Sequence, residues 1–258
     1  MKFPHRRLLS GLLCILFLGQ LTPTYAQSGV SDQDLFQAVA GMGLALGLEV
    51  FAKDHFMPDQ PRYSNPGALD VHMRNKLLWA QESQHRAEIW SDRLIYGVSL
   101  SSLAWGPLST TNRERALLIN MEVFAINSLV TNVTKILSAR ERPYKHYGSR
   151  ESWGSKDYAS FFSGHSSVAF SQAVTNAILL SEDYPEREVL IWSSLLGLAG
   201  TTAYLRVASD MHYFTDVVVG AAVGSLIAWT LTHSELDRIK DNSNTGADFN
   251  VTFKIPLG

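Results

Sequence analysis

Apolar residues recur every three to four positions through most of this chain, the spacing of residues that share one helix face. The pattern predicts seven helices, at 31–54, 71–89, 91–106, 112–140, 164–181, 186–208 and 214–236. Two segments, 57–70 and 144–160, interrupt it with Pro, Gly and polar residues, as expected of loops. We therefore expect an all-α multi-helix bundle, the first helix being capped by Ser31 or Asp32. The tail 248–258 alternates apolar and polar residues, which predicts one short extended segment.

The first 26 residues have the composition of a secretory signal peptide. A basic start precedes an apolar run, and Thr24 and Ala26 occupy the small-residue positions before a cleavage site. Export to the periplasm or the medium would leave 27–258 as a single α-helical domain. A retained membrane anchor is the alternative interpretation. Cys14, the only cysteine of the chain, lies in this segment, so the mature domain would contain no disulfide.

Two later segments are free of charge, 189–205 and 217–232. Both fall just short of the roughly 18–20 residues that a membrane span needs. The helix at 112–140 contains Asn and Glu residues that suit a protein interior better than lipid. We expect a soluble bundle in which one or two apolar helices are buried at the centre, and membrane-associated arrangements stay open.

The balance of basic and acidic residues limits which classes of partner the protein is expected to bind. The chain has 22 basic and 24 acidic residues, and the leader removes only basic ones. A mildly acidic domain is not expected to bind nucleic acid, so clusters of basic residues and histidines stand out against this background.

The first cluster lies in "KILSARERP". Lys135 and Arg142 are seven residues apart, which places them on one face if the helix continues that far. Pro143 disfavours helix at Arg142, so this arginine is expected where the helix ends. A solvated basic helix end is the plainer interpretation, but it suits Lys135 less well because apolar residues follow it.

The second cluster is "SGH". Ser163 can cap the helix that follows, and Gly164 allows a ligand to approach the backbone. The unpaired amides of a first helical turn bind anions. His165 would then lie beside the anion, although a helix cap with an incidental histidine is the simpler explanation of this stretch alone.

The third cluster is "LRVASDMHYFTD". Arg206 ends one apolar helix, and His212 is followed four residues later by Asp216. A carboxylate at that spacing can hold one imidazole nitrogen and leave the other nucleophilic. A structural His–Asp pair or half of a metal site are the alternatives, but further metal ligands at suitable spacing are missing from the sequence.

Taken together, Lys-x6-Arg-Pro at 135–143, Ser-Gly-His at 163–165 and Arg-x5-His-x3-Asp at 206–216 resemble the type-2 phosphatidic acid phosphatase superfamily. That superfamily includes bacterial class A acid phosphatases and vanadium haloperoxidases. Two positions depart from its pattern. Phe162 stands where the family usually has proline, and Leu205 stands where it usually has serine.

The resemblance implies a role for each motif residue. His212 would attack phosphorus and carry it as phosphohistidine, Asp216 would orient His212, and His165 would protonate the leaving oxygen. Five residues would hold the phosphoryl oxygens: Lys135, Arg142, Ser163, Gly164 and Arg206. No metal or other cofactor is implied, and the substrate would be a phosphorylated lipid or small molecule.

Two other functions stay open at this stage. A vanadate-dependent haloperoxidase would use vanadate as its cofactor in the same cradle, and an inactive periplasmic anion-binding protein would keep the cradle alone. The aromatic residues of 144–160 fit either a rim for a lipid or a nucleotide base, or ordinary packing. The sequence does not predict the oligomeric state.

Overall fold

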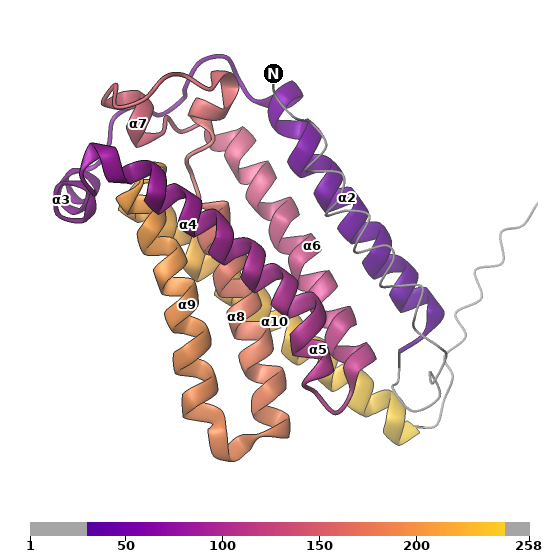
Figure 1. Cartoon of the computed structure of the whole chain (residues 1–258). Helices are drawn as coiled ribbons and strands as arrows, with labels where there is room; N and C mark the ends of the chain where they lie inside the picture. Colours follow the sequence, from indigo (N-terminus) through magenta and orange to yellow (C-terminus); the bar gives the residue numbers. More distant parts are fainter. Residues whose placement is uncertain (1–29, 246–258) are drawn as a thin grey trace, which may run out of the picture.

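The structure is a computed structural model that describes residues 30–245 (Figure 1). Helices make up most of this part, which contains no β-strand and only one isolated bridge, between Tyr63 and Arg140. The all-α prediction is confirmed. The predicted signal peptide, 1–26, and the predicted extended tail, 248–258, lie outside the described residues.

The described chain consists of α-helices joined by short turns and single-turn elements. In order they are α2 (Asp32–Phe56), α3 (Ala68–Leu77), α4 (Gln81–Leu100), the π-helix η2 (Ser101–Trp105), α5 (Gly106–Leu108), α6 (Arg113–Ser138), α7 (Pro143–His146), the 3-10 helix η3 (Gly154–Tyr158), α8 (Gly164–Asp183), the 3-10 helix η4 (Pro185–Arg187), α9 (Glu188–Ala208) and α10 (Phe214–Thr245).

One predicted boundary is wrong. The pattern placed a break near residue 90, but α3 ends at Leu77 and α4 runs without interruption past that point. The backbone is extended at Leu78 and Ala80 instead. The amide of Trp79 donates to the carbonyl of Ala208 at 3.1 Å, so a contact with a distant helix replaces a helical bond. No Gly or Pro marks this break in the sequence.

The helix starts follow local sequence more closely. Ser31 caps α2 through a reciprocal pair of hydrogen bonds with Asp34, one of the two expected caps. Asn112 caps α6 by accepting from the amide of Arg115. Side-chain oxygens at these positions satisfy amides that have no partner within the helix.

α8 lies at the centre of the bundle, packed against α6, α9 and α10. An apolar cluster joins α6, α8 and α10 through Ile119, Val123, Val174, Ile178 and Leu236. The contact between α8 and α10 is very close, because a Cβ atom at Gly224 would lie 2.1 Å from the carbonyl oxygen of Ser167. Only glycine allows the two backbones to approach this far.

The polar residues of α6 face the interior, as expected. Asn120, Asn127 and Asn132 are all buried, and the amide of Asn176 on α8 donates to Asn120 at 2.9 Å. Buried amides that pair in this way fix the relative position of two helices as well as stabilising them.

The expected burial of the two most apolar helices is wrong. Three helices of the described chain are long and apolar enough to cross a membrane, at Arg113–Ser138, Pro185–Ala208 and Phe214–Arg238. Only 17% of the most apolar window of the second and 28% of that of the third is buried. Large apolar side chains such as Val189, Leu190 and Leu226 face outward. This surface favours association with a membrane.

All three sequence motifs lie at one end of the bundle. α6 and α9 end there, and α8 and α10 begin there, whereas the turn between α8 and α9 lies at the opposite end (Figure 1). The amide of Ser163 donates to the carbonyl of Asp216 at 3.0 Å, which joins the starts of α8 and α10 directly.

Candidate active site

The start of α8 has the capped geometry that the sequence predicts. Ser163 is extended and buried, and its side chain accepts from the amide of Ser166. Phe162, in place of the family's usual proline, is almost fully buried. A Cβ atom at Gly164 would lie 3.3 Å from Thr131 and 3.7 Å from Cε of Lys135. The second motif therefore lies directly against the lysine of the first.

The carbonyl of Ser160 holds the imidazole of His212. Nδ1 lies 2.8 Å from this oxygen, so Nδ1 carries the proton and donates, and Nε2 keeps its lone pair. Asp216 was expected to hold this nitrogen, but its nearest oxygen is 3.7 Å away, too far for a hydrogen bond. The backbone carbonyl of Ser160 fixes the tautomer of His212, and Asp216 acts indirectly, through Ser160.

Asp216 organises the segment that carries this carbonyl. It accepts from the hydroxyl of Ser160 at 2.6 Å and from the amide of Tyr213 at 2.9 Å. It also pairs with Arg140 at 2.6 Å, and Arg140 in turn pairs with Asp70 on α3. The carboxylate thus fixes both Ser160 and the turn that presents His212.

His212 is neutral near pH 7. Burial first, and then the positive charges of Arg142, Lys135 and Arg206, hold its pKa well below the usual value. Nε2 lies 3.4 Å from Nη1 of Arg142. Arg142 donates to the lone pair of this neutral imidazole over a long distance, and an anion that takes over the guanidinium would leave Nε2 able to act as a nucleophile.

Asp92 on α4 joins His165 to Arg206. Its Oδ1 atom lies 2.8 Å from Nε2 of His165 and 3.1 Å from Nη1 of Arg206. Burial and the charge of Arg206 lower the pKa of His165 to about 4, and Asp92 opposes this shift. The side chain of His165 remains 30% exposed, which leaves it accessible to a substrate.

Three cations converge on the same place. Lys135 is buried and donates to the carbonyl of Ala159 at 2.7 Å. Arg142 donates to the carbonyls of Lys156 and Met211. Nε of Arg206 is buried without a hydrogen-bond partner in the described structure, and such a donor suits an anionic oxygen.

The first motif reaches the site differently from the helical spacing considered in the sequence. α6 ends at Ser138, and Ala139 adopts a left-handed conformation with φ of 42°. Arg142 is extended, so only Lys135 lies on the helix. The chain turns sharply between the two cations, and the turn rather than a shared helix face brings them together.

Sequence reasoning named eight site residues, and the structure gathers them at one end of the bundle. It missed three residues that support them. Asp92 belongs to no motif, Ser160 contributes mainly its backbone carbonyl, and Arg140 resembles a solvated residue of a basic helix end. Asp92 lies among other polar and charged residues of α4, Glu88, Ser91 and Arg93, so its position in the sequence gives no signal.

Among the described residues, no group of three or more His, Cys, Asp or Glu side chains is placed to hold a metal ion. The arrangement presents cations and histidines to an oxyanion, with a nucleophilic nitrogen at its base. Fold and site together define the class of protein, an all-helical protein with cations and histidines arranged around a place suited to an oxyanion.

Comparison with known families agrees with this class. Residues 116–240 match the PAP2 superfamily, which includes the type-2 phosphatidic acid phosphatases. The match confirms the resemblance drawn from the three motifs. Similarity to this superfamily implies phosphatase-type activity. No curated protein sequence matches the chain significantly.

Proposed function

We propose that this protein is a metal-independent phosphatase that hydrolyses phosphomonoesters through a phosphohistidine at His212. The observation that carries the proposal is the state of this histidine. Its Nδ1 proton is engaged by Ser160, its ring is neutral, and Nε2 faces Arg142 within a group of three cations. Simple anion binding needs no nucleophile prepared in this way.

In the first step, the lone pair on Nε2 of His212 attacks phosphorus and the bond to the leaving oxygen breaks. Lys135, Arg142 and Arg206 stabilise the charge that spreads over the three equatorial oxygens. The amides at the start of α8, held open by Ser163 and Gly164, complete the cradle. His165 gives its proton to the departing oxygen, so the alcohol leaves neutral.

In the second step, His165 has lost its proton and acts as a base. It takes a proton from water, the hydroxide oxygen bonds to phosphorus, and the bond from phosphorus to Nε2 breaks. His165 passes this proton to the inorganic phosphate as it leaves, so both histidines return to the neutral state of the free protein.

Substrate binding itself supplies the proton that His165 needs. A pKa of about 4 leaves His165 neutral in the free protein near pH 7. A bound phosphate carries negative charge next to Arg206 and Arg142, which offsets the field that lowers this pKa. The proton of a monoanionic phosphate, whose second pKa is about 6, can then pass to the imidazole.

The outward-facing apolar helices support a membrane-bound enzyme. If Pro185–Ala208 and Phe214–Arg238 cross the bilayer, the site at the ends of α6, α8, α9 and α10 lies at one membrane surface. The predicted leader would direct that surface to the periplasm. A phosphorylated lipid or a small organic phosphate could reach it there.

The test is release of inorganic phosphate from an aryl phosphate by the purified full-length protein in detergent, with and without chelator. We expect steady turnover that the chelator does not change. His212→Ala should remove turnover almost entirely, by a factor of at least about 10³, with the helical circular dichroism and thermal midpoint retained. A folded His212→Ala protein with full activity would overturn the proposal.

A further inference from the structure

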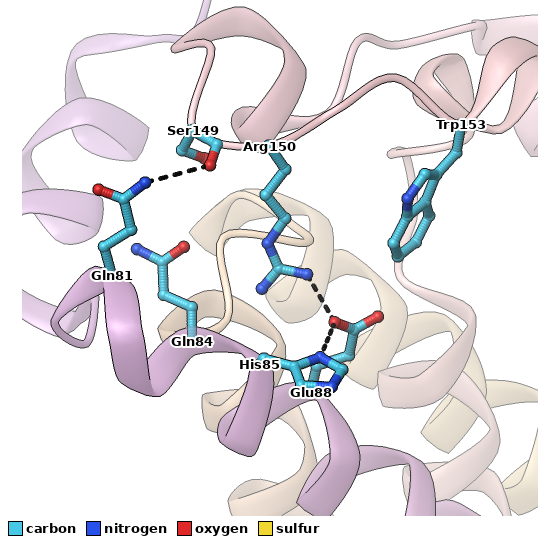
Figure 2. A pocket seen from close by; sticks show the side chains of 7 residues that line it. All are labelled: Gln81, Gln84, His85, Glu88, Ser149, Arg150 and Trp153. Atoms are coloured by element: carbon cyan, nitrogen blue, oxygen red, sulfur yellow. Dashed lines mark hydrogen bonds and ion pairs between the residues drawn. The ribbon is translucent and has the colours of Figure 1, made fainter.

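A cavity of about 410 Å³ lies beside the phosphoryl site, between the first turns of α4 and the loop after α7. Figure 2 shows its walls: Gln81, Gln84, His85 and Glu88 rise from α4, and Ser149, Arg150 and Trp153 come from the loop. Most of these side chains are polar, although the functional motifs include none of them.

Gln84 is the most informative of these residues. It is only 4% exposed, and its amide nitrogen donates weakly to the carbonyl of Trp79 at 3.3 Å. Its Oε1 atom is buried and has no hydrogen-bond partner in the described structure. The side chain extends from α4 toward the Ser149–Arg150 segment (Figure 2). A buried acceptor without a partner is costly unless a ligand provides a donor.

Two lining residues of the cavity, Glu88 and Arg150, connect it to the neighbourhood of the phosphoryl site. Glu88 lies four residues before Asp92, so the two share one helix face. Arg150 reaches across from the loop, pairs with Glu88, and donates to the carbonyl of Ser209 at 2.8 Å. It also lies 3.8 Å from the sulfur of Met211, the residue before His212.

The charges in the cavity argue against a second anion site. Glu88 engages the guanidinium of Arg150, so the strongest cation is already neutralised and a carboxylate would face any anion. The cavity therefore offers a mixture of hydrogen-bond donors and acceptors, from the carboxamides of Gln81 and Gln84 and from the Glu88–Arg150 ion pair. These groups lie next to the half-exposed indole of Trp153. Hydroxyl groups both donate and accept, and an indole face packs well against the C–H face of a sugar or polyol.

We infer that this cavity binds the leaving group of the substrate, and that the leaving group is rich in hydroxyls, of the sugar or glycerol type. The inference rests on the proposed phosphatase function. Oε1 of Gln84 accepts a hydroxyl proton, and the Glu88–Arg150 pair binds a neighbouring hydroxyl, while the phosphate lies against the three cations. Such a group occurs on soluble sugar phosphates and on phosphorylated glycolipids.

The experiment compares matched substrates on the full-length protein in detergent. Glucose 1-phosphate and cyclohexyl phosphate share a six-membered ring, but only the first carries hydroxyls on it. A site that binds hydroxyls discriminates strongly against an analogue that lacks them. We expect kcat/KM at least about tenfold higher for glucose 1-phosphate. A parallel pair, a phosphorylated glycolipid and phosphatidic acid, tells whether the preferred hydroxyls come from a lipid or a soluble compound.

Variants then test whether the preference for glucose 1-phosphate over cyclohexyl phosphate arises in this cavity. Gln84→Leu should reduce it about tenfold and leave aryl phosphate turnover within twofold of the unmodified protein. Gln172→Leu is the matched control, because Gln172 is also buried, and its amide atoms also have no hydrogen-bond partner among the described residues, but it lies on α8, outside the cavity. Gln81→Leu, at an exposed wall position, should reduce the preference for hydroxylated substrates about threefold. This variant tests the inference even if the protein does not fold with the buried Gln84→Leu change.

Equal turnover of both members of each pair would overturn the inference, as would a preference that neither Gln84→Leu nor Gln81→Leu changes. In both cases aryl phosphate hydrolysis that depends on His212 would persist. Failure of the phosphatase proposal itself is distinct, because it would appear as no turnover of any phosphate ester.

Discussion

Asp92 carries two contacts that meet at one oxygen. His165 and Arg206 both bind its Oδ1 atom, at 2.8 and 3.1 Å. The carboxylate therefore sets the position of the proposed proton donor, His165, relative to Arg206, a proposed phosphoryl-binding cation. It also opposes the depression of the His165 pKa. We regard it as a positioning residue for the leaving-group step.

Replacing this carboxylate should have an effect that depends on the leaving group. In Asp92→Asn, His165 binds its proton less tightly, so an alkyl alcohol leaves without help. Turnover of an alkyl phosphate should fall by about 10²-fold or more. 4-Nitrophenyl phosphate needs little protonation and should lose much less. Steady-state kinetics with both substrates measure the difference, and Asp59→Asn, at an exposed position, is the control. Equal losses on both substrates would contradict this role.

The motif residues of the site were predictable, and their supports were not. Lys135, His165 and His212 are recognised because their spacing within short motifs is visible in the chain. Asp92 meets His165 across 73 residues, and helix packing alone creates that contact. Ser160 acts through a carbonyl that every residue possesses, so its side-chain type gives no signal.

At the scale of elements, the contact between α8 and α10 matters most for the site. It joins the helix that begins with Ser163 to the helix that begins just after His212. Gly220 and Gly224 permit the approach, since Cβ atoms there would lie 2.6 and 2.1 Å from the carbonyl oxygens of Ser163 and Ser167.

Gly224→Ala should therefore force the two helices apart. Overpacking against a backbone costs about 1–3 kcal/mol, and the activity should fall with the stability because the motifs separate. Gly197→Ala on α9 is the matched control. Apart from its chain neighbours and the backbone of its own helix, no atom of residues 30–245 lies within 4 Å of its added methyl group, so stability should be unchanged or rise by about 0.5–1 kcal/mol. Thermal midpoints in detergent compare the two, and equal midpoints would contradict the packing argument.

The spacing of apolar residues predicted which segments form helices. It predicted where a helix begins or ends only where side chains at that position determine the boundary. Ser31 caps α2 through its own side chain, a local signal. The break at 78–80 depends on a hydrogen bond from Trp79 to Ala208, and the end of α6 depends on the left-handed Ala139. No Gly or Pro marks the break at 78–80, and Pro143 predicts the end of α6 only to within a few residues.

At the scale of the whole molecule, α9 and α10 present an apolar surface, and the sequence did not tell whether these helices would be buried or exposed. A helix that is apolar on all sides is typical both of the centre of a soluble bundle and of a membrane span. The arrangement of the other helices decides between them. Because α8 and α6 occupy the interior, α9 and α10 are pushed outward, and Val189 is 83% exposed.

Membrane fractionation tests this surface. We expect the full-length protein to remain with the membrane through high salt and an alkaline wash, and to be released by detergent. Salt and alkali remove proteins held by charge, whereas buried apolar helices resist them. Val189→Lys and Leu226→Lys together should weaken this retention. Release of the unmodified protein by the alkaline wash would contradict a membrane-embedded arrangement.

The central claim is that His212 becomes phosphorylated, and trapping the intermediate tests it most directly. The full-length protein is mixed with substrate carrying radioactive phosphorus, stopped within milliseconds in alkaline detergent, and digested, and the labelled peptide is identified. We predict label on the peptide that contains His212, at a nitrogen-linked phosphate that acid removes and alkali preserves. The label should be absent in His212→Ala. Turnover without any label, or label on a different residue, would contradict the account.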